Sequence, residues 1–169
     1  MTRKSMIRDI RRQPGFFGIA AYNPKHEVNV GTLWRTAMIY QAGLIGTVGT
    51  RRYQAQASDT PRTPNHIPLQ HYRDVDDLIE HLPYGCPLIG VELDDRAVPL
   101  TSFQHPRNAF YLLGAEDHGL PAKVLDRCHH VVQIPTPAAF SMNVSVAGSI
   151  LMYDRATKAE CATRVEVAA

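Results

Sequence analysis

Three blocks of polar and small residues, far apart in the sequence, carry the side chains best suited to chemistry. They are Asn29-Val-Gly-Thr-Leu-Trp-Arg35, Leu113-Gly-Ala-Glu-Asp-His-Gly119, and Ile134-Pro135 followed by Phe140-Ser-Met-Asn-Val-Ser-Val-Ala147. An arginine, a carboxylate, a hydroxyl and two amides can bind anions or polar ligands. Ser141 lies in no G-x-S-x-G motif, and the spacing assigns no Ser-His-Asp set. Ligand binding and proton handling are therefore better supported than acyl-enzyme chemistry.

In the second block, a strand over 109–114 ends at Gly114, where the absent side chain lets a ligand approach the backbone. Glu116 follows as a carboxylate near a potential cation, and Gly119 permits a positive φ before the next helix. A simple strand-to-helix turn with a solvated glutamate explains the same residues, and both interpretations stay open.

In the third block, Ile134-Pro135 ends a strand, and a loop of small residues leads to Ser141 and Asn143 at the start of the final helix. Helix N-terminal amides and a capping side chain can bind the polar groups of a ligand. A capping role and a ligand contact are compatible.

In the first block, Asn29 is a favourable cap residue, and the periodicity predicts a helix that begins there. Apolar residues gather on one side of this helix, which leaves Arg35 on the other, facing solvent or a neighbouring molecule. An exposed helical arginine is commonplace, so this position alone does not indicate catalysis.

Alternating strand and helix signals must position these blocks. Strands are expected over 16–22, 44–50, 87–93, 109–114 and 131–134, with helices from 29, over 74–82, 121–127 and 143–158, and a loop over 51–68. Strands joined by helical crossovers predict an α/β fold, a mostly parallel sheet with helices on both faces. We expect one domain over 1–169, with a basic tail at 1–14 and a C-terminal tail at 159–169.

Composition excludes several classes of protein. With 169 residues, 44% hydrophobic and 20% charged, the chain is typical of a soluble globular domain, and a net charge of +2 gives little support for a polyanionic partner. Basic residues do cluster in the first fourteen positions and around Tyr53, as Arg51, Arg52 and Arg62. We expect a cytoplasmic protein without export or membrane segments, and without a metal site, since the three cysteines show no metal-binding spacing. Dinucleotide and P-loop motifs are missing.

Taken in order, the three blocks resemble the knotted SPOUT RNA 2′-O-methyltransferases of the TrmH-like (SpoU) branch, over roughly residues 16–155. The resemblance implies methyl transfer from S-adenosylmethionine to a ribose 2′-hydroxyl in RNA, either tRNA or rRNA. It also implies a C-terminal trefoil knot and a homodimer that pairs through the final helix, whose apolar residues lie nearly all round it.

The resemblance also assigns roles to individual residues. Arg35 matches the arginine that activates the 2′-hydroxyl and Asn29 the asparagine that supports it, with Ser141 and Asn143 also at the catalytic site. Because arginine is a poor base, we favour phosphate binding and alkoxide stabilisation for Arg35 over proton abstraction. The expected cofactor-binding residues are Val91, Gly114, Glu116, Gly119, Ile134, Ser141, Met142 and Asn143.

The chain departs from the family in its loop 136–140, which is one residue shorter and carries an extra proline. Two alternatives stay open. One is a non-catalytic RNA-binding relative, and the other is a methyltransferase that acts on a base or on a substrate other than RNA.

Overall fold

The computed structural model describes residues 15–53, 67–138 and 140–168, with side chains placed as far as Lys158. The expected basic tail at 1–14, Arg62 and most of the predicted loop 51–68 lie outside the described residues. Within the described residues, no helix combines the length and the apolar character needed to cross a bilayer.

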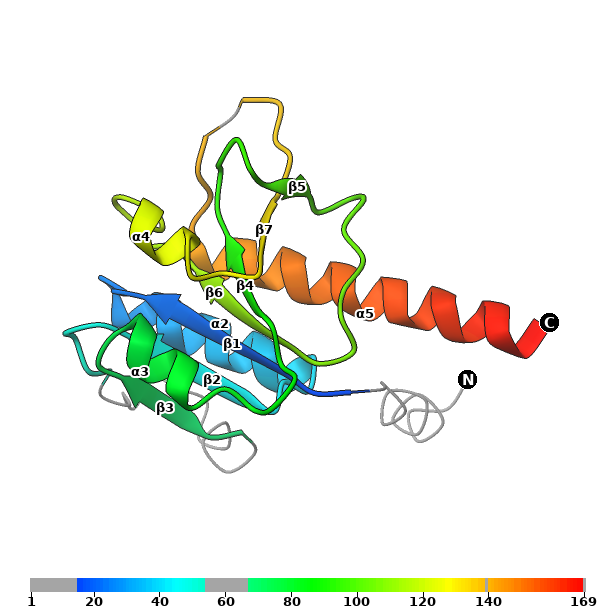
Figure 1. Ribbon diagram of the computed structural model, residues 1–169, viewed down its shortest axis with the longest axis horizontal. Coiled ribbons are helices and arrows are strands. Elements are labelled where there is room, and N and C mark those ends of the chain that lie inside the picture. Colours follow the sequence, from blue (N-terminus) through cyan, green and yellow to red (C-terminus); the bar gives the residue numbers. More distant parts are fainter. Residues whose placement is uncertain (1–14, 54–66, 139, 169) are drawn as a thin grey trace.

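In the described part of the chain, seven strands form one sheet in the order β3-β2-β1-β6-β4-β7-β5, and every neighbouring pair is parallel. Along the chain the elements are β1 (Phe17–Tyr22), α2 (Glu27–Ile39), β2 (Leu44–Val48), β3 (Leu69–Tyr72), α3 (Val75–Glu80), β4 (Leu88–Val91), β5 (Val98–Pro99), β6 (Ala109–Leu113), α4 (Ala122–Leu125), β7 (His130–Gln133) and α5 (Val144–Ala168). Figure 1 shows α5 extending past the sheet towards the C-terminus.

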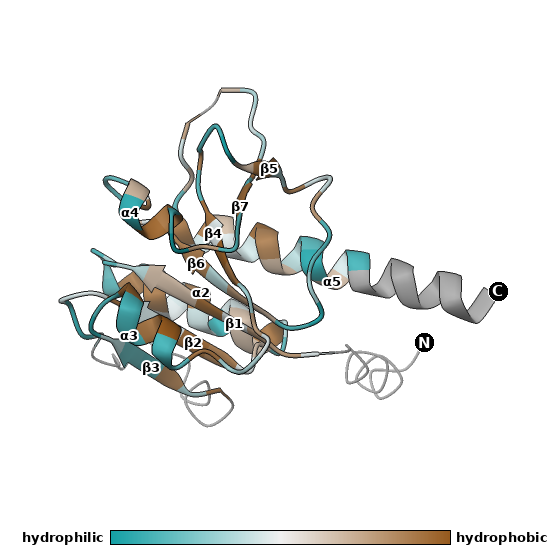
Figure 2. Cartoon of the chain, in the orientation of Figure 1, coloured by the Kyte–Doolittle hydropathy of each residue, from teal (hydrophilic) through white to brown (hydrophobic). Residues whose placement is uncertain are grey.

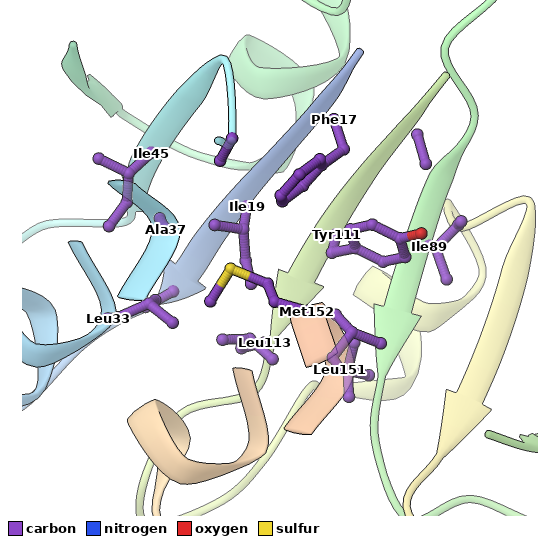
Figure 3. Close-up of a cluster of buried hydrophobic side chains, with 14 of the residues drawn as sticks. Phe17, Ile19, Leu33, Ala37, Ile45, Ile89, Tyr111, Leu113, Leu151 and Met152 are labelled. Atoms are coloured by element: carbon purple, nitrogen blue, oxygen red, sulfur yellow. The ribbon is translucent and has the colours of Figure 1, made fainter. Parts of the chain in front are cut away.

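Both faces of the sheet are covered, which confirms the predicted α/β class. One buried cluster joins α2 and α5 to alternate strand residues such as Ile19 and Tyr111, and Figure 3 shows these side chains interleaved. A second cluster joins α3 and α4 to the intervening strand residues, Phe110 and Leu112 among them. Central strands covered on both faces need continuous apolar runs. Figure 2 shows apolar residues along β1 and β6 and polar ones on the edge strand β3. The trefoil knot implied by the resemblance stays a prediction.

Helices α2 and α5 pack closely because small residues lie between them. A Cβ added at Gly148 would lie 2.4 Å from Leu33 Cδ1. Next along the chain, Ser149 Oγ donates to Thr36 Oγ1 at 3.3 Å. This close crossing brings the start of α5 next to the first turn of α2.

Three sequence expectations need correction. The first helix does not begin at Asn29 but at Glu27, with His26 as its N-cap residue, because the Asn29 amide is occupied by a contact with Asn143 beside α5. The second strand ends at Val48, where Gly49 adopts a φ of +123° and leaves the extended conformation. The final helix continues to Ala168 instead of ending at Lys158.

Strands β3 and β5 were not predicted. β3 is an edge strand of four residues and β5 pairs through two residues only. Neither has the continuous apolar run that revealed the central strands.

Candidate functional site

A cavity of about 330 Å³ lies at the carboxyl ends of β4 and β6, between the segment after β7 and the start of α5. Parallel sheets place ligands at this edge, where strand ends leave backbone groups free. Seven residues expected at a cofactor site line it together: Val91, Gly114, Glu116, Gly119, Ile134, Ser141 and Met142. Segments far apart in the sequence thus surround one hollow.

A five-residue hairpin, Ala115 to Gly119, forms one wall of the cavity. Ala115 and Gly119 pair as an isolated antiparallel bridge, with N–H···O distances of 3.1 and 3.0 Å. Gly119 adopts a φ of +63°, as expected from the sequence. Side chains are excluded at both glycines, because a Cβ at Gly114 would lie 2.5 Å from Glu92 Oε2 and one at Gly119 would lie 2.3 Å from it.

Glu92 fixes the base of this hairpin, and sequence reasoning missed it. Its Oε2 atom accepts a hydrogen bond of 2.6 Å from the Leu120 backbone N–H. Glu92 also lines the cavity. The one available signal was its position, since it directly follows the apolar strand β4.

Glu116 connects the hairpin to the start of α2. Its Oε1 atom accepts from the His26 backbone N–H at 3.3 Å, and its Oε2 atom lies 3.6 Å from His26 Nε2. The Glu116 side chain is only 13% exposed. The described side chain facing the Glu116 carboxylate is therefore the imidazole of His26.

Asn143 and Asn29 meet although 114 residues separate them. Asn143 Nδ2 donates to Asn29 Oδ1 at 3.0 Å, while Asn143 Oδ1 accepts from Ser145 N–H at 2.9 Å and Ser145 Oγ at 2.7 Å. Asn143 thus caps α5, as its position at the helix start suggested, and links this cap to the first turn of α2. Neither asparagine is among the described residues that line the cavity, whereas Ser141, Met142 and Val144 are.

Arg35 lies apart from the other expected catalytic residues. It is exposed on α2, six residues beyond Asn29, which corresponds to about 9 Å along the helix axis. It is not among the described residues that line the cavity. Within one chain, the structure brings the expected cofactor-binding segments together but leaves Arg35 outside them.

Eight further lining residues were not predicted as site residues: Leu93, Leu113, Ala115, Asp117, His118, Phe140, Val144 and Ala147. Asp117 and His118 lie within the second sequence block, but nothing in the sequence assigned them a role. Phe140 is 79% exposed, and its place at the cavity mouth depends on the path of the loop, which periodicity does not reveal.

The cavity combines apolar walls, backbone groups and a few fixed polar side chains. Such a lining fits an organic ligand better than a bare metal ion. In the described part of the chain, no three His, Cys, Asp or Glu side chains are grouped closely enough to hold a metal.

Comparison with protein families matches residues 17–153 to the SpoU rRNA methylase family. Among curated proteins, the chain is 26% identical to the mouse tRNA (guanosine(18)-2′-O)-methyltransferase TARBP1, over 75% of this chain and 8% of that protein. It is 34% identical to the 23S rRNA (guanosine-2′-O-)-methyltransferase RlmB of Acinetobacter baylyi, over 40% of this chain and 27% of that protein. The matched segments therefore span about a quarter or less of these two relatives.

Two solved structures have a similar fold. The TrmH/SpoU tRNA modifying enzyme of A. aeolicus superposes with a TM-score of 0.74 at 17% identity, over 93% of this chain and 84% of that one. The AdoMet-bound rRNA methyltransferase of Sinorhizobium meliloti gives a TM-score of 0.68 at 23% identity, over 88% of this chain and 59% of that one.

Proposed function

Because this chain belongs to the SpoU rRNA methylase family, we propose that it transfers a methyl group from S-adenosylmethionine to the ribose 2′-hydroxyl of a nucleotide in tRNA or rRNA. The observation that carries the proposal is the cavity at the strand ends. Seven of the residues that the resemblance predicts to bind the cofactor line it together. The names of TARBP1 and RlmB, both 2′-O-methyltransferases, support the same reaction.

The residues of the cavity suit S-adenosylmethionine. Gly114 and Gly119 leave the hairpin backbone open to close approach, and Val91, Ile134 and Met142 supply apolar contacts. The hydroxyl of Ser141 and the amides at the start of α5 can donate hydrogen bonds to its polar groups. When bound, S-adenosylmethionine supplies a methyl group already activated by its sulfonium.

The chain's own residues would then align the 2′-hydroxyl and help its proton to leave. Arg35 lies outside the cavity lining, so we assign it to the RNA: it binds a phosphate beside the target ribose and stabilises the developing alkoxide. Asn29 and Asn143 act as positioning residues, since their hydrogen bond fixes the start of α5 against α2.

The proposal is tested with Arg35→Ala, measuring methyl transfer to unmodified tRNA and rRNA together with calorimetric titration by S-adenosylmethionine. We expect turnover to fall by about 100-fold or more, as for loss of other transition-state contacts, with cofactor affinity close to that of wild type. Arg127→Ala is the control, because Arg127 is a half-exposed arginine that is not among the described residues lining the cavity. Near-normal transfer by Arg35→Ala would overturn the role of Arg35, and transfer to a 2′-deoxy substrate would overturn ribose methylation.

We also propose that the protein acts as a homodimer paired through α5. On this helix, Val146, Ile150 and Tyr153 recur at intervals of four and three residues, which places them on one face. Val146 is 49% exposed and Tyr153 61% exposed. Sedimentation velocity should give twice the mass of one chain, and Tyr153→Glu should shift it to a single chain. A wild-type protein of single-chain mass would contradict this proposal.

A further inference from the structure

A second cavity, of about 390 Å³, lies beside the first and shares its hairpin wall. All five residues from Ala115 to Gly119 line both cavities. The opposite wall of the second cavity comes from the end of β1, which contributes Tyr22, and from the segments that follow β1 and β2, which contribute Lys25 and Arg51. A volume of this size accommodates a group as large as a nucleotide rather than a single ion.

The backbone that carries the two cations is fixed. Asn23 adopts a left-handed φ of 43°, and its N–H donates to the Val48 carbonyl at 2.7 Å, which joins the end of β1 to the end of β2. Arg51 Nη1 then donates to the Lys25 carbonyl at 3.3 Å. Arg51 and Lys25 are therefore presented together at the rim of this cavity.

The two cations differ in how far their charge is neutralised. Lys25 Nζ lies 2.9 Å from Asp117 Oδ2 on the shared hairpin, and this hydrogen bond lowers the pKa of Asp117. Among the described residues, no carboxylate lies within ion-pair distance of Arg51. An anion that enters the cavity therefore meets one guanidinium that no described carboxylate pairs with, and one lysine that can exchange Asp117 for the anion.

We propose that the second cavity binds a phosphodiester of the RNA substrate, with Arg51 and Lys25 as its phosphate contacts. The inference rests on the proposed function, because it places the RNA backbone on the far side of the wall that encloses the cofactor. Guanidinium groups bind phosphate in a planar, two-pronged geometry. Asp117 opposes phosphate binding, because its carboxylate pairs with the Lys25 ammonium and repels the phosphate.

The test is the salt dependence of RNA binding by the full chain. Unfractionated tRNA serves as the probe, and filter binding gives the dissociation constant between about 50 and 200 mM salt, a range over which phosphate contacts change the affinity strongly. Each lost phosphate contact should reduce the slope of log affinity against log salt by about 0.7 to 0.9. We expect Arg51→Ala to show this reduction and Asp117→Asn to bind tRNA several-fold more tightly than wild type.

Arg127→Ala is the matched control, because it removes the same charge from a half-exposed arginine that is not among the described residues lining either cavity. An Arg51→Ala slope equal to that of Arg127→Ala would overturn the phosphate site, as would unchanged tRNA binding by Asp117→Asn. Failure of the proposed function is a separate result. It would appear as wild-type protein that transfers no methyl group, whatever the slopes of the variants.

Discussion

The hydrogen bond between Asn29 and Asn143 offers a quantitative test of how the site is held together. Asn143→Ala removes the cap of α5, which costs about 1 kcal/mol. It also leaves Oδ1 of Asn29, a residue only 8% exposed, without its partner, which costs about 1 to 2 kcal/mol. We therefore expect the free energy of unfolding to fall by about 2 to 3 kcal/mol.

Two further variants separate the contributions to this loss. Asn143→Asp keeps the acceptor that caps α5 but has no N–H to donate to Asn29, so it should lose about 1 kcal/mol. Asn29→Ala should lose a similar amount, because water can reach the exposed Asn143 amide. In the double variant Asn29→Ala/Asn143→Ala, the loss should be about 1 kcal/mol smaller than the sum of the single losses.

Urea unfolding followed by circular dichroism measures these four free energies. Calorimetric titration with S-adenosylmethionine then shows whether the cavity depends on the pair, since Ser141 and Met142 directly precede the cap. The reasoning would be refuted if the losses of Asn29→Ala and Asn143→Ala summed to the loss of the double variant within about 0.3 kcal/mol, because independent sites are additive in that way.

Three other outcomes are expected. Gly119→Ala should destabilise the protein and weaken cofactor binding in calorimetry, because its Cβ would meet the Glu92 carboxylate. Gly85 has a similar φ of +70° but open space around it. The control Gly85→Ala should therefore lose only about 1 kcal/mol of unfolding free energy and leave cofactor binding unchanged. Burial lowers the pKa of His105 below 6.5 in the folded protein, so on acidification the unfolded chain takes up a proton at this residue first, and stability falls as the pH drops below 6.5. Urea unfolding across about pH 5 to 8 should give a flatter dependence of stability on pH for His105→Gln than for wild type. Identical pH dependences would contradict this. Burial raises the pKa of Cys128 to about 11, so peptide-resolved mass spectrometry at about pH 8 should find it alkylated far more slowly than a cysteine in the urea-unfolded protein.

The central strands could be predicted because burial on both faces imposes continuous apolar runs, as in Ala109-Phe-Tyr-Leu-Leu113. The positive φ of Gly119 could also be predicted, since a tight turn between strand and helix favours glycine. β3 could not, because its Leu-Gln-His-Tyr sequence has only the weak alternation of an edge strand. β5 was too short to produce any pattern.

The candidate site was predictable in its lining but not in its contacts. The resemblance selected seven residues that the fold brings together, whereas Glu92, the pairing of Asn29 with Asn143 and the second cavity depend on tertiary structure. Helical periodicity correctly predicted that Arg35 is exposed and that Leu33 and Trp34 are buried. Periodicity could not reveal that His26 would be the N-cap residue, since its side chain makes no capping hydrogen bond. Asn29 is the better cap residue by type, but its side chain instead accepts a hydrogen bond from Asn143.

The hairpin from Ala115 to Gly119 gives the two cavities a common partition, so a ligand that displaced it from one side would alter the cavity on the other side. If a ligand bound in one cavity changes the affinity of the other cavity for its ligand by a given factor, the second ligand must change the affinity for the first by the same factor. The total binding free energy then does not depend on the order in which the two ligands bind. The order decides only which ligand meets a hairpin that the other ligand has displaced. Lys25 and His26 hold this partition through their contacts with Asp117 and Glu116. If the proposed phosphodiester displaces Asp117 from Lys25, its departure would let this contact re-form and so change the cofactor cavity on the other side of the hairpin.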